Sequence, residues 1–222
     1  MLEKKVIHCG QLSDCAADNS KVRLFFQDEA SFGRISDPYY CWCPQGVRPV
    51  VPRQKIREYR EIFGAVEPET GDIVYMIDHK EKPKKKKMGR PKNGETADSK
   101  KPKTVEKGSK TRVMNIFLQM LSDKYPNDHI VCVLDNAWIH RSQYSVVPKN
   151  ITLVFIPPAT PEMNPKEQVW REIRTKGFNN RYFHTIDEVV DNLHSTIANL
   201  SPEKIKSITQ RDWVKECIKL IS

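Results

Sequence analysis

Residues 130–135 read Ile-Val-Cys-Val-Leu-Asp, and this stretch decides the fold. Its apolar residues follow one another without alternation and end in an acid, the pattern of a central strand buried on both faces. Residues 151–156 form a second such run, which ends before two prolines, so we predict another central strand there. Strands of this kind belong to sheets covered by helices, and the stretch therefore indicates an α/β fold.

The residues upstream predict a further strand and a hairpin. Val22 to Gln27 is a short apolar run that ends at Asp28, so we predict a buried strand that stops there. Glu61 to Asp78 carries a polar interruption at residues 67–72 between two apolar runs, which is the pattern of a hairpin. With Tyr40 to Val51 as a further extended piece, we expect an antiparallel sheet of about three strands in the first third of the chain.

Helical spacing governs most of the remaining chain. A helix that ends before Pro126 is predicted by apolar residues at helical intervals, namely Val113, Ile116, Phe117, Met120 and Leu121. The spacing becomes helical again from Asn164, with Pro165 in the first turn. Two amphipathic helices, Ile186 to Leu200 and Pro202 to Ile221, finish the chain. We therefore expect a mixed α/β sheet flanked by helices.

The positive charge of the chain is concentrated in one segment. The net charge is +9, and residues 80–110 alone hold 13 Lys and Arg against 4 Asp and Glu, a balance of +9. The remainder is formally neutral, so only this segment argues for an attraction to nucleic acid. It has no aromatic and few apolar residues, and we expect a disordered insertion because it cannot bury enough surface to fold.

Composition restricts the class of protein. With 222 residues, of which 38% are hydrophobic, the chain can form a sizeable core. Its six cysteines show no Cys-x-x-Cys spacing, and no signal peptide is evident, so we expect a reduced, cytoplasmic protein. No apolar run approaches the ~18 residues of a membrane span. Cys41 and Cys43 lack a partner pair at the spacing of a structural zinc site, so zinc is not expected.

Three acids occupy comparable places in the predicted elements. Asp28 and Asp135 each follow an apolar strand, and Glu167 opens a helix after another strand. Ligand sites of such sheets gather at strand ends, and magnesium prefers oxygen ligands. Two such ions about 4 Å apart can promote phosphodiester displacement. An acid at a strand end is more often a turn former or a solvated rim residue, so spacing alone leaves both interpretations open.

The sequence around these acids carries a family resemblance. Residues 134–140 (Leu-Asp-Asn-Ala-Trp-Ile-His) and 157–170 (Pro-Pro-Ala-Thr-Pro-Glu-Met-Asn-Pro-Lys-Glu-Gln-Val-Trp) resemble the second and third acidic motifs of DDE transposases in the mariner-related bacterial insertion-sequence family six-thirty. Residues 28–34 (Asp-Glu-Ala-Ser-Phe-Gly-Arg) look like the first motif, and a Trp-x-Pro-x-Gly phrase follows at residues 42–46. The three motifs occur in the family's order between about residues 22 and 170.

The resemblance implies a ribonuclease-H-like fold and cut-and-paste DNA transposition. It assigns Asp28, Asp135 and Glu167 as catalytic residues and as ligands of two Mg²⁺ or Mn²⁺ ions. Water would hydrolyse the phosphodiester at a transposon end, and the freed 3′ hydroxyl would attack target DNA, at a TA dinucleotide. The implied partners are transposon-end and target DNA and a second copy of the chain, because two ends are handled together. The implied location is the cytoplasm, in association with the nucleoid.

The same resemblance suggests how the chain is divided. Residues 1–21 would be an N-terminal extension, residues 22–200 the catalytic domain with the insertion at 80–110, and residues 201–222 a C-terminal helix. The family carries an N-terminal helix-turn-helix region that recognises transposon ends, whereas only about twenty residues precede the first predicted strand here. We therefore expect end recognition to reside on a separate or longer product, and expect this chain to cut poorly or unspecifically by itself.

Other polar residues near the motifs have two interpretations each. His140 either lies near the scissile phosphate or is a hydrogen-bonded residue at a helix start. Arg171 and Arg174 are candidates for phosphate contacts, although Arg171 could instead pair with Glu167 four residues earlier. Trp170 fits the core better than a base-stacking platform. Asn164 is interpreted as a helix cap, and four further acids are ranked below the chosen three, namely Glu29, Asp37, Asp78 and Glu162.

The lysine-rich insertion contains a possible DNA-binding motif. Lys84 to Lys92 centres on Gly-Arg-Pro and resembles the AT-hook, whose Arg enters a narrow A·T minor groove, although Met88 stands where a basic residue is expected. The alternative is a solvated loop that attracts phosphates without specificity. The candidate DNA-contacting residues of this segment are Lys85, Lys86, Lys87, Arg90 and Lys92.

Two other functions compete with an active transposase core. One is a non-catalytic DNA-binding or regulatory derivative of a transposase that lacks end recognition, although the presence of all three acids argues against decay. The other is a host nuclease or resolvase on the same fold, which would cut DNA by structure and would not join it.

Overall fold

Five strands form one mixed sheet in the computed structural model, which describes residues 21–36, 38–78, 109–135, 145–157 and 164–221. The strand order is β3-β2-β1-β4-β5. β1 pairs antiparallel with β2, and β2 with β3, while β4 runs parallel to β1, and β5 to β4. The strands are β1 (Val22–Ser36), β2 (Gln54–Glu67), β3 (Asp72–Asp78), β4 (His129–Leu134) and β5 (Ile151–Phe155).

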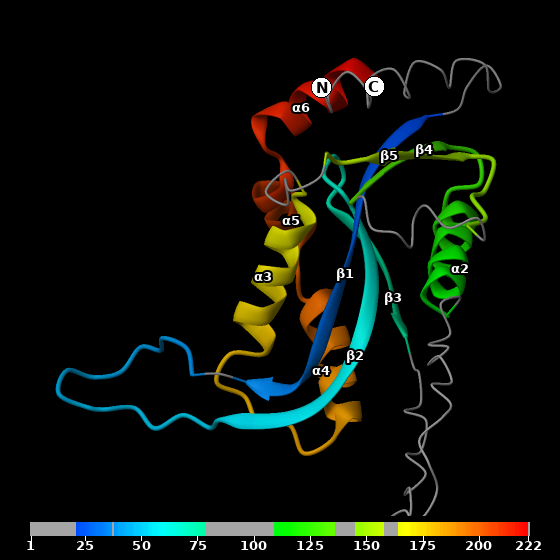
Figure 1. Cartoon of the computed structure of the whole chain (residues 1–222). Coiled ribbons are helices and arrows are strands. Elements are labelled where there is room, and N and C mark those ends of the chain that lie inside the picture. Colours follow the sequence, from blue (N-terminus) through cyan, green and yellow to red (C-terminus); the bar gives the residue numbers. More distant parts are fainter. Residues whose placement is uncertain (1–20, 37, 79–108, 136–144, 158–163, 222) are drawn as a thin grey trace, which may run out of the picture.

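Helices cover both faces of this sheet (Figure 1). α2 (Ser109–Lys124) lies on one face, and α3 (Lys166–Gly177), α4 (Ile186–Ala198) and α5 (Pro202–Thr209) lie on the other. α6 (Asp212–Ile221) follows α5, and Val214 and Cys217 join the same core as α3 and α4. In the described ranges no helix has both the length and the apolarity needed to cross a membrane.

Alternation along the strands divides the apolar side chains between two cores. On β1, Leu24 and Phe26 belong to the core under α3 and α4, whereas Phe25 belongs to the core under α2. On β4, Val133 joins the first core and Leu134 the second. Both strands are thus buried on both faces, which is why their sequences are apolar without a break.

β1 is longer than the sequence predicts. The expected end at Gln27 is wrong, because the strand continues to Ser36 and Asp28 lies in its middle. Parallel pairing with β4 stops at Phe26↔Val133, but antiparallel pairing with β2 continues past it to Ser36↔Gln54. One edge of β1 is therefore uncovered by β4 from Asp28 onward, while the other edge remains hydrogen-bonded.

The extended piece predicted at Tyr40 to Val51 is also not a strand. Residues 38–53 instead form an arm that projects from the sheet between β1 and β2 (Figure 1). Side chains of this arm, including Tyr40 at 95% and Trp42 at 104% relative exposure, make no core. The predicted hairpin, in contrast, is confirmed as β2 and β3.

Two pairs of hydrogen bonds attach the base of the arm to the connection between α3 and α4. Tyr39 N donates to the Asn180 side-chain oxygen at 2.8 Å, and Asn180 Nδ2 donates to Tyr39 O at 3.0 Å. At the other leg, Gln54 Nε2 donates to Phe183 O at 2.7 Å and Phe183 N donates to Gln54 Oε1 at 3.1 Å. We call these two pairs the amide clasps.

Two other sequence predictions need adjustment. β5 is an edge strand of the described sheet, not a central one. The predicted helix from Pro202 to Ile221 breaks in two at Gln210, whose ψ of 75° leaves the helix and whose side-chain amide donates to Pro68 O at 2.7 Å. Most of the lysine-rich insertion, residues 79–108, and the N-terminal residues 1–20 lie outside the described residues.

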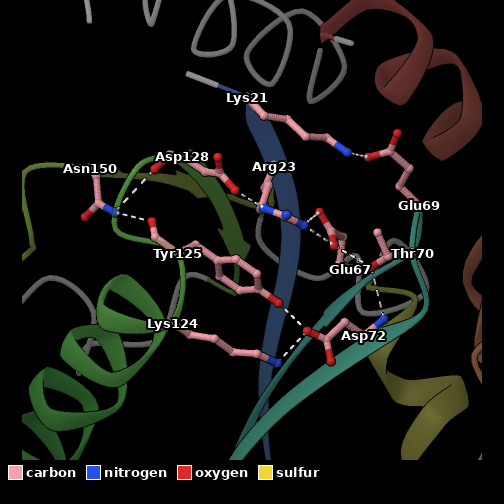
Figure 2. A network of polar contacts seen from close by, with 10 residues as sticks. All are labelled: Lys21, Arg23, Glu67, Glu69, Thr70, Asp72, Lys124, Tyr125, Asp128 and Asn150. Carbon is pink, nitrogen blue, oxygen red and sulfur yellow. Dashed lines mark hydrogen bonds and ion pairs between the residues drawn. The ribbon is translucent and has the colours of Figure 1, made fainter. Parts of the chain in front are cut away.

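A polar network fixes the start of β1 to the neighbouring turns (Figure 2). Arg23 donates to both carboxylate oxygens of the fully buried Glu67, at 3.1 and 2.9 Å, and to Asp128. Its guanidinium also lies 4.3 Å from the centre of the Tyr125 ring. The hydroxyl of Tyr125 donates in turn to Asp72. The network joins β1 to the β2–β3 turn and to the α2–β4 turn.

Candidate active site

Asp28 is a largely buried carboxylate on the α3 side of the sheet. Trp170 Nε1 donates to its Oδ2 at 3.1 Å, and Glu29 N donates to its Oδ1 at 2.8 Å. Burial raises the pKa of Asp28 to about 6, although these two donors and the nearby Lys166 favour the ionised form. The effect of burial on this carboxylate therefore outweighs that of its donors and of the nearby Lys166.

Asp135 lies beside Asp28 at the end of β4. The last parallel pair is Phe26↔Val133, two residues before each acid, so both acids occur at equivalent steps of neighbouring strands. Val133 and Phe26 share the core under α3, and Asp135 follows β4 directly, two residues after the last residue of β4 that pairs with β1. The charge of Asp135 adds to burial in raising the pKa of Asp28, which indicates that the two carboxylates are close.

Glu167 approaches the same region from the helix above it. It lies in the first turn of α3 and is exposed. Together with Asp28 it lines an open pocket of about 570 Å³. The remaining lining residues are Glu29, Ala30, Tyr39, Trp170, Arg171, Arg174, Thr175 and Asn179. The pocket therefore combines carboxylates with two arginines from one face of α3.

The three predicted acids converge on one region without forming a closed cage. Among the described residues, no three His, Cys, Asp or Glu side chains are grouped so that they could hold one metal ion. Like-charged carboxylates repel one another, and a divalent cation supplies the attraction that draws them together. The donors fit a hard ion such as Mg²⁺ or Mn²⁺ because they are carboxylate oxygens.

Glu29 is a fourth acid that the sequence ranked too low. It lines the pocket, and burial raises its pKa to about 7, with the charges of Asp135 and Asp28 adding to the effect. Gln27 Nε2 donates to Glu29 Oε1 at 3.4 Å. Glu29 follows Asp28 on β1, and both residues line the pocket.

Asn164 bonds the start of α3, although the N-cap residue of the helix is Pro165 and not Asn164 as predicted. Its side-chain oxygen accepts a hydrogen bond from Lys166 N at 3.0 Å, and its Nδ2 donates to Gln27 O at 3.0 Å. Asn164 therefore attaches the start of α3 to β1 immediately before Asp28. This attachment brings the helix that carries Glu167 onto the strand that carries the first acid.

Two of the predicted DNA-contacting residues lie in the pocket. Arg171 and Arg174 both line it, and the Arg174 guanidinium lies 5.0 Å from the centre of the Phe32 ring. Burial lowers the pKa of Arg174, while Asp28 opposes that effect. Outside the described residues lie Asp37, Lys85, Lys86, Lys87, Arg90, Lys92, His140 and Glu162.

Comparison with known proteins points to one kind of domain. A family profile described as DDE superfamily endonuclease matches residues 95–190. An uncharacterised protein of Sinorhizobium fredii (strain NBRC 101917 / NGR234), y4pE/y4sA, is 41% identical over 87 residues, which are 38% of this chain and 64% of that protein. The chain thus spans less than two thirds of that relative.

Solved structures with the same fold are complexes of the Mos1 transposase. The paired-end complex with the left transposon end and the mariner paired-end complex with Mn each match with a TM-score of 0.57 at 13% identity, and cover 99% of this chain and 60% of theirs. The paired-end complex with Mg matches with a TM-score of 0.53 at 14% identity. The mixed sheet flanked by helices is therefore the ribonuclease-H-like fold of those structures, as the sequence resemblance led us to expect.

Proposed function

We propose that the chain carries the catalytic domain of a DDE-superfamily transposase, which cuts DNA strands at transposon ends and joins them to target DNA. The observation that supports this most is the pocket that Asp28 and Glu167 line together, with Asp135 following directly after β4, the strand that pairs with β1. Two metal ions held by such acids promote displacement at phosphorus by water or by a 3′ hydroxyl.

The proposed cofactors are two Mg²⁺ or Mn²⁺ ions held by Asp28, Asp135 and Glu167. When bound, such ions polarise the phosphoryl oxygens and stabilise the charge of the leaving oxygen. Two of the Mos1 complexes with this fold are described with Mn and with Mg. The charge that a cation brings would also compensate the buried Asp28 carboxylate, whose pKa burial raises to about 6.

The proposed substrate is DNA, held by its phosphates in the pocket. Arg171 and Arg174 lie beside the acids, and a guanidinium binds a phosphate with paired hydrogen bonds. Phosphates bound there would lie between the arginines of α3 and the carboxylates. The same proposal includes insertion at TA dinucleotides and action as a homodimer on DNA. It also places the protein in the cytoplasm beside the nucleoid.

The proposal is tested by a metal-dependent nicking and joining assay with the matching transposon ends. Asp135→Asn should abolish both reactions, because an amide cannot replace a carboxylate as a ligand of a divalent ion. Its thermal unfolding should match that of the unmodified chain. Asp123→Asn, which removes an exposed acid of α2 distant from the site, is the matched control. Full activity of Asp135→Asn would refute the assignment.

A non-catalytic DNA-binding or regulatory derivative of a transposase remains a second candidate, because no three described His, Cys, Asp or Glu side chains are grouped to hold one metal ion. This alternative expects DNA binding without nicking in either Mg²⁺ or Mn²⁺. Transposon-end binding in a gel-shift assay, combined with an inactive unmodified chain, would favour it. Nicking that Asp135→Asn removes would favour the enzyme.

A further inference from the structure

The indole of Trp170 makes a directed polar contact that core packing does not require. Its ring is buried, with 3% relative exposure, and packs edge-on against Phe32 at 5.9 Å between ring centres. Its Nε1 nevertheless points out of the core and donates to Asp28 Oδ2 at 3.1 Å. A phenylalanine would fill much of the same space but could not make this bond.

The opposite side of the indole is fixed by a buried lysine. Lys166 is fully buried, and its Nζ lies 4.3 Å from the centre of the Trp170 ring. In the described part of the chain this Nζ has no hydrogen-bond partner, so its contacts are the indole face and the charge of the nearby Asp28. Lys166 and Trp170 are one helical turn apart on α3, which holds them in this stack.

The strand opposite provides the room that both side chains need. Gly64 of β2 pairs with Asp28 of β1. A Cβ at Gly64 would lie 2.8 Å from Lys166 Nζ and 2.9 Å from Trp170 Cη2, closer than atoms pack. A glycine at this step of β2 thus leaves the space in which the amine and the indole sit behind Asp28.

We propose that Trp170 is a positioning residue for Asp28, and that its N–H holds this carboxylate in the orientation in which it binds a divalent cation. The inference rests on the proposed function, because it takes Asp28 as a metal ligand. One donor occupies each oxygen of Asp28, Trp170 N–H on Oδ2 and Glu29 N–H on Oδ1. An ionised carboxylate oxygen accepts more than one bond, so both retain an acceptor site for a metal.

The size of the effect follows from other metal sites. Hydrogen bonds that orient a ligand from behind typically contribute 10–100-fold to metal affinity or activity. Trp170→Phe keeps an aromatic ring under Lys166 and against Phe32 but removes the donor. We therefore expect Mn²⁺ to bind this variant at least about 10-fold more weakly than the unmodified chain.

Direct metal binding provides the test. Free Mn²⁺ is measured by electron paramagnetic resonance during titration of the protein without DNA, and thermal unfolding is followed in parallel. Trp213→Phe is the matched control, since Trp213 also packs edge-on against a core phenylalanine, Phe26, at 5.6 Å between ring centres. It should bind Mn²⁺ as the unmodified chain does. Equal Mn²⁺ affinity in Trp170→Phe and Trp213→Phe would overturn the proposal.

A second measurement uses the unmodified chain, so its result does not depend on whether a variant folds. In the ¹⁵N-labelled chain, Mg²⁺ should shift the indole N–H resonance of Trp170, because its acceptor becomes a metal ligand, and should leave that of Trp213 in place. An unmoved Trp170 resonance at saturating Mg²⁺ would also overturn the inference. Absence of any Mn²⁺ binding by the unmodified chain would instead refute the proposed metal site itself, so the two failures are distinct.

Discussion

Asp28 illustrates a conflict between burial and function at a single residue. Its position behind Trp170 takes the carboxylate out of water and raises its pKa from 3.8 to about 6. A metal ligand must be ionised, so the protein without a cation contains a charge that its surroundings disfavour. This part of the site therefore costs stability until a cation binds.

The conflict predicts how stability depends on pH. The pKa of Asp28 in the folded chain lies above that of the unfolded chain, so the folded state retains a proton that the unfolded state loses. The free energy of unfolding should fall as pH rises from about 4 to 6. Asp28→Asn should therefore be more stable than the unmodified chain at pH 8 without metal, by up to about 3 kcal/mol, since one pKa unit corresponds to about 1.4 kcal/mol.

Urea denaturation at pH 4 and pH 8 measures this difference. The two proteins should converge at pH 4, and saturating Mg²⁺ at pH 8 should stabilise only the unmodified chain. Asp123→Asn, at an exposed site on α2, should show neither effect. A stability difference that stays constant between the two pH values would contradict the account.

Sequence found the principal acids but not the residues around them. Asp28 and Glu167 were identified from their motifs, and the structure puts both in one pocket. The bond from Trp170 to Asp28 depends on how α3 crosses β1, and no local pattern encodes that crossing. Trp170 does lie one helical turn after Glu167, which is the one signal in the sequence that it faces the site.

At the scale of elements, β1, the β2–β3 turn and the α2–β4 turn meet through the polar network around Arg23 (Figure 2). Glu67 has no exposed surface, and its charge is compensated by Arg23, which donates to both of its oxygens, while the Thr70 hydroxyl donates to one of them. Asn150 extends the network by donating to the backbone oxygens of Tyr125 and Asp128, at 3.1 and 3.3 Å. Three segments distant in sequence thus depend on one guanidinium.

Removal of that guanidinium should destabilise the fold strongly. Arg23→Met leaves the buried Glu67 carboxylate without its cation, and the loss of one partner of a buried pair typically costs about 3–5 kcal/mol. Lys21→Met is the matched control on the same chain segment, because Lys21 forms a partly exposed ion pair with Glu69 at 3.0 Å. It should cost no more than about 1 kcal/mol. Equal losses in chemical denaturation would contradict the role given to Glu67.

The sequence predicted the elements that local periodicity and turn residues determine. It did not predict features that depend on another segment of the chain. The β2–β3 hairpin and α2 follow from local periodicity and turn residues, and both are present. The extension of β1 past Asp28 depends on β2, which pairs with residues of mixed polarity as far as Ser36. The break at Gln210 likewise depends on a distant acceptor, Pro68 O.

At the scale of the whole molecule, charge and fold are separated along the chain. Residues 80–110 account for the entire net charge of +9, and the described sheet and helices are assembled from the nearly neutral remainder. Proposed DNA binding would then have two components. One consists of the pocket arginines beside the acids, and the other is the lysine-rich segment, whose AT-hook resemblance remains a prediction.

The second component should appear in the salt dependence of DNA affinity. Replacement of residues 84–92 by Gly and Ser of equal length removes six positive charges while preserving chain length. If those residues contact phosphates, the slope of log affinity against log salt should become less steep by up to about 5, since each contact contributes about 0.9. Fluorescence anisotropy with labelled duplexes measures the slope. An unchanged slope would exclude the segment from DNA binding.

The amide clasps fix the arm at residues 38–53 at its base and leave its other end without a core contact. Both of its legs are anchored, one by Asn180 and the other through Phe183, while its aromatic end is free in solvent. A molecule that binds the exposed aromatic end of the arm would therefore also pull on the connection between α3, which carries Glu167, and α4, and not only on β1 and β2.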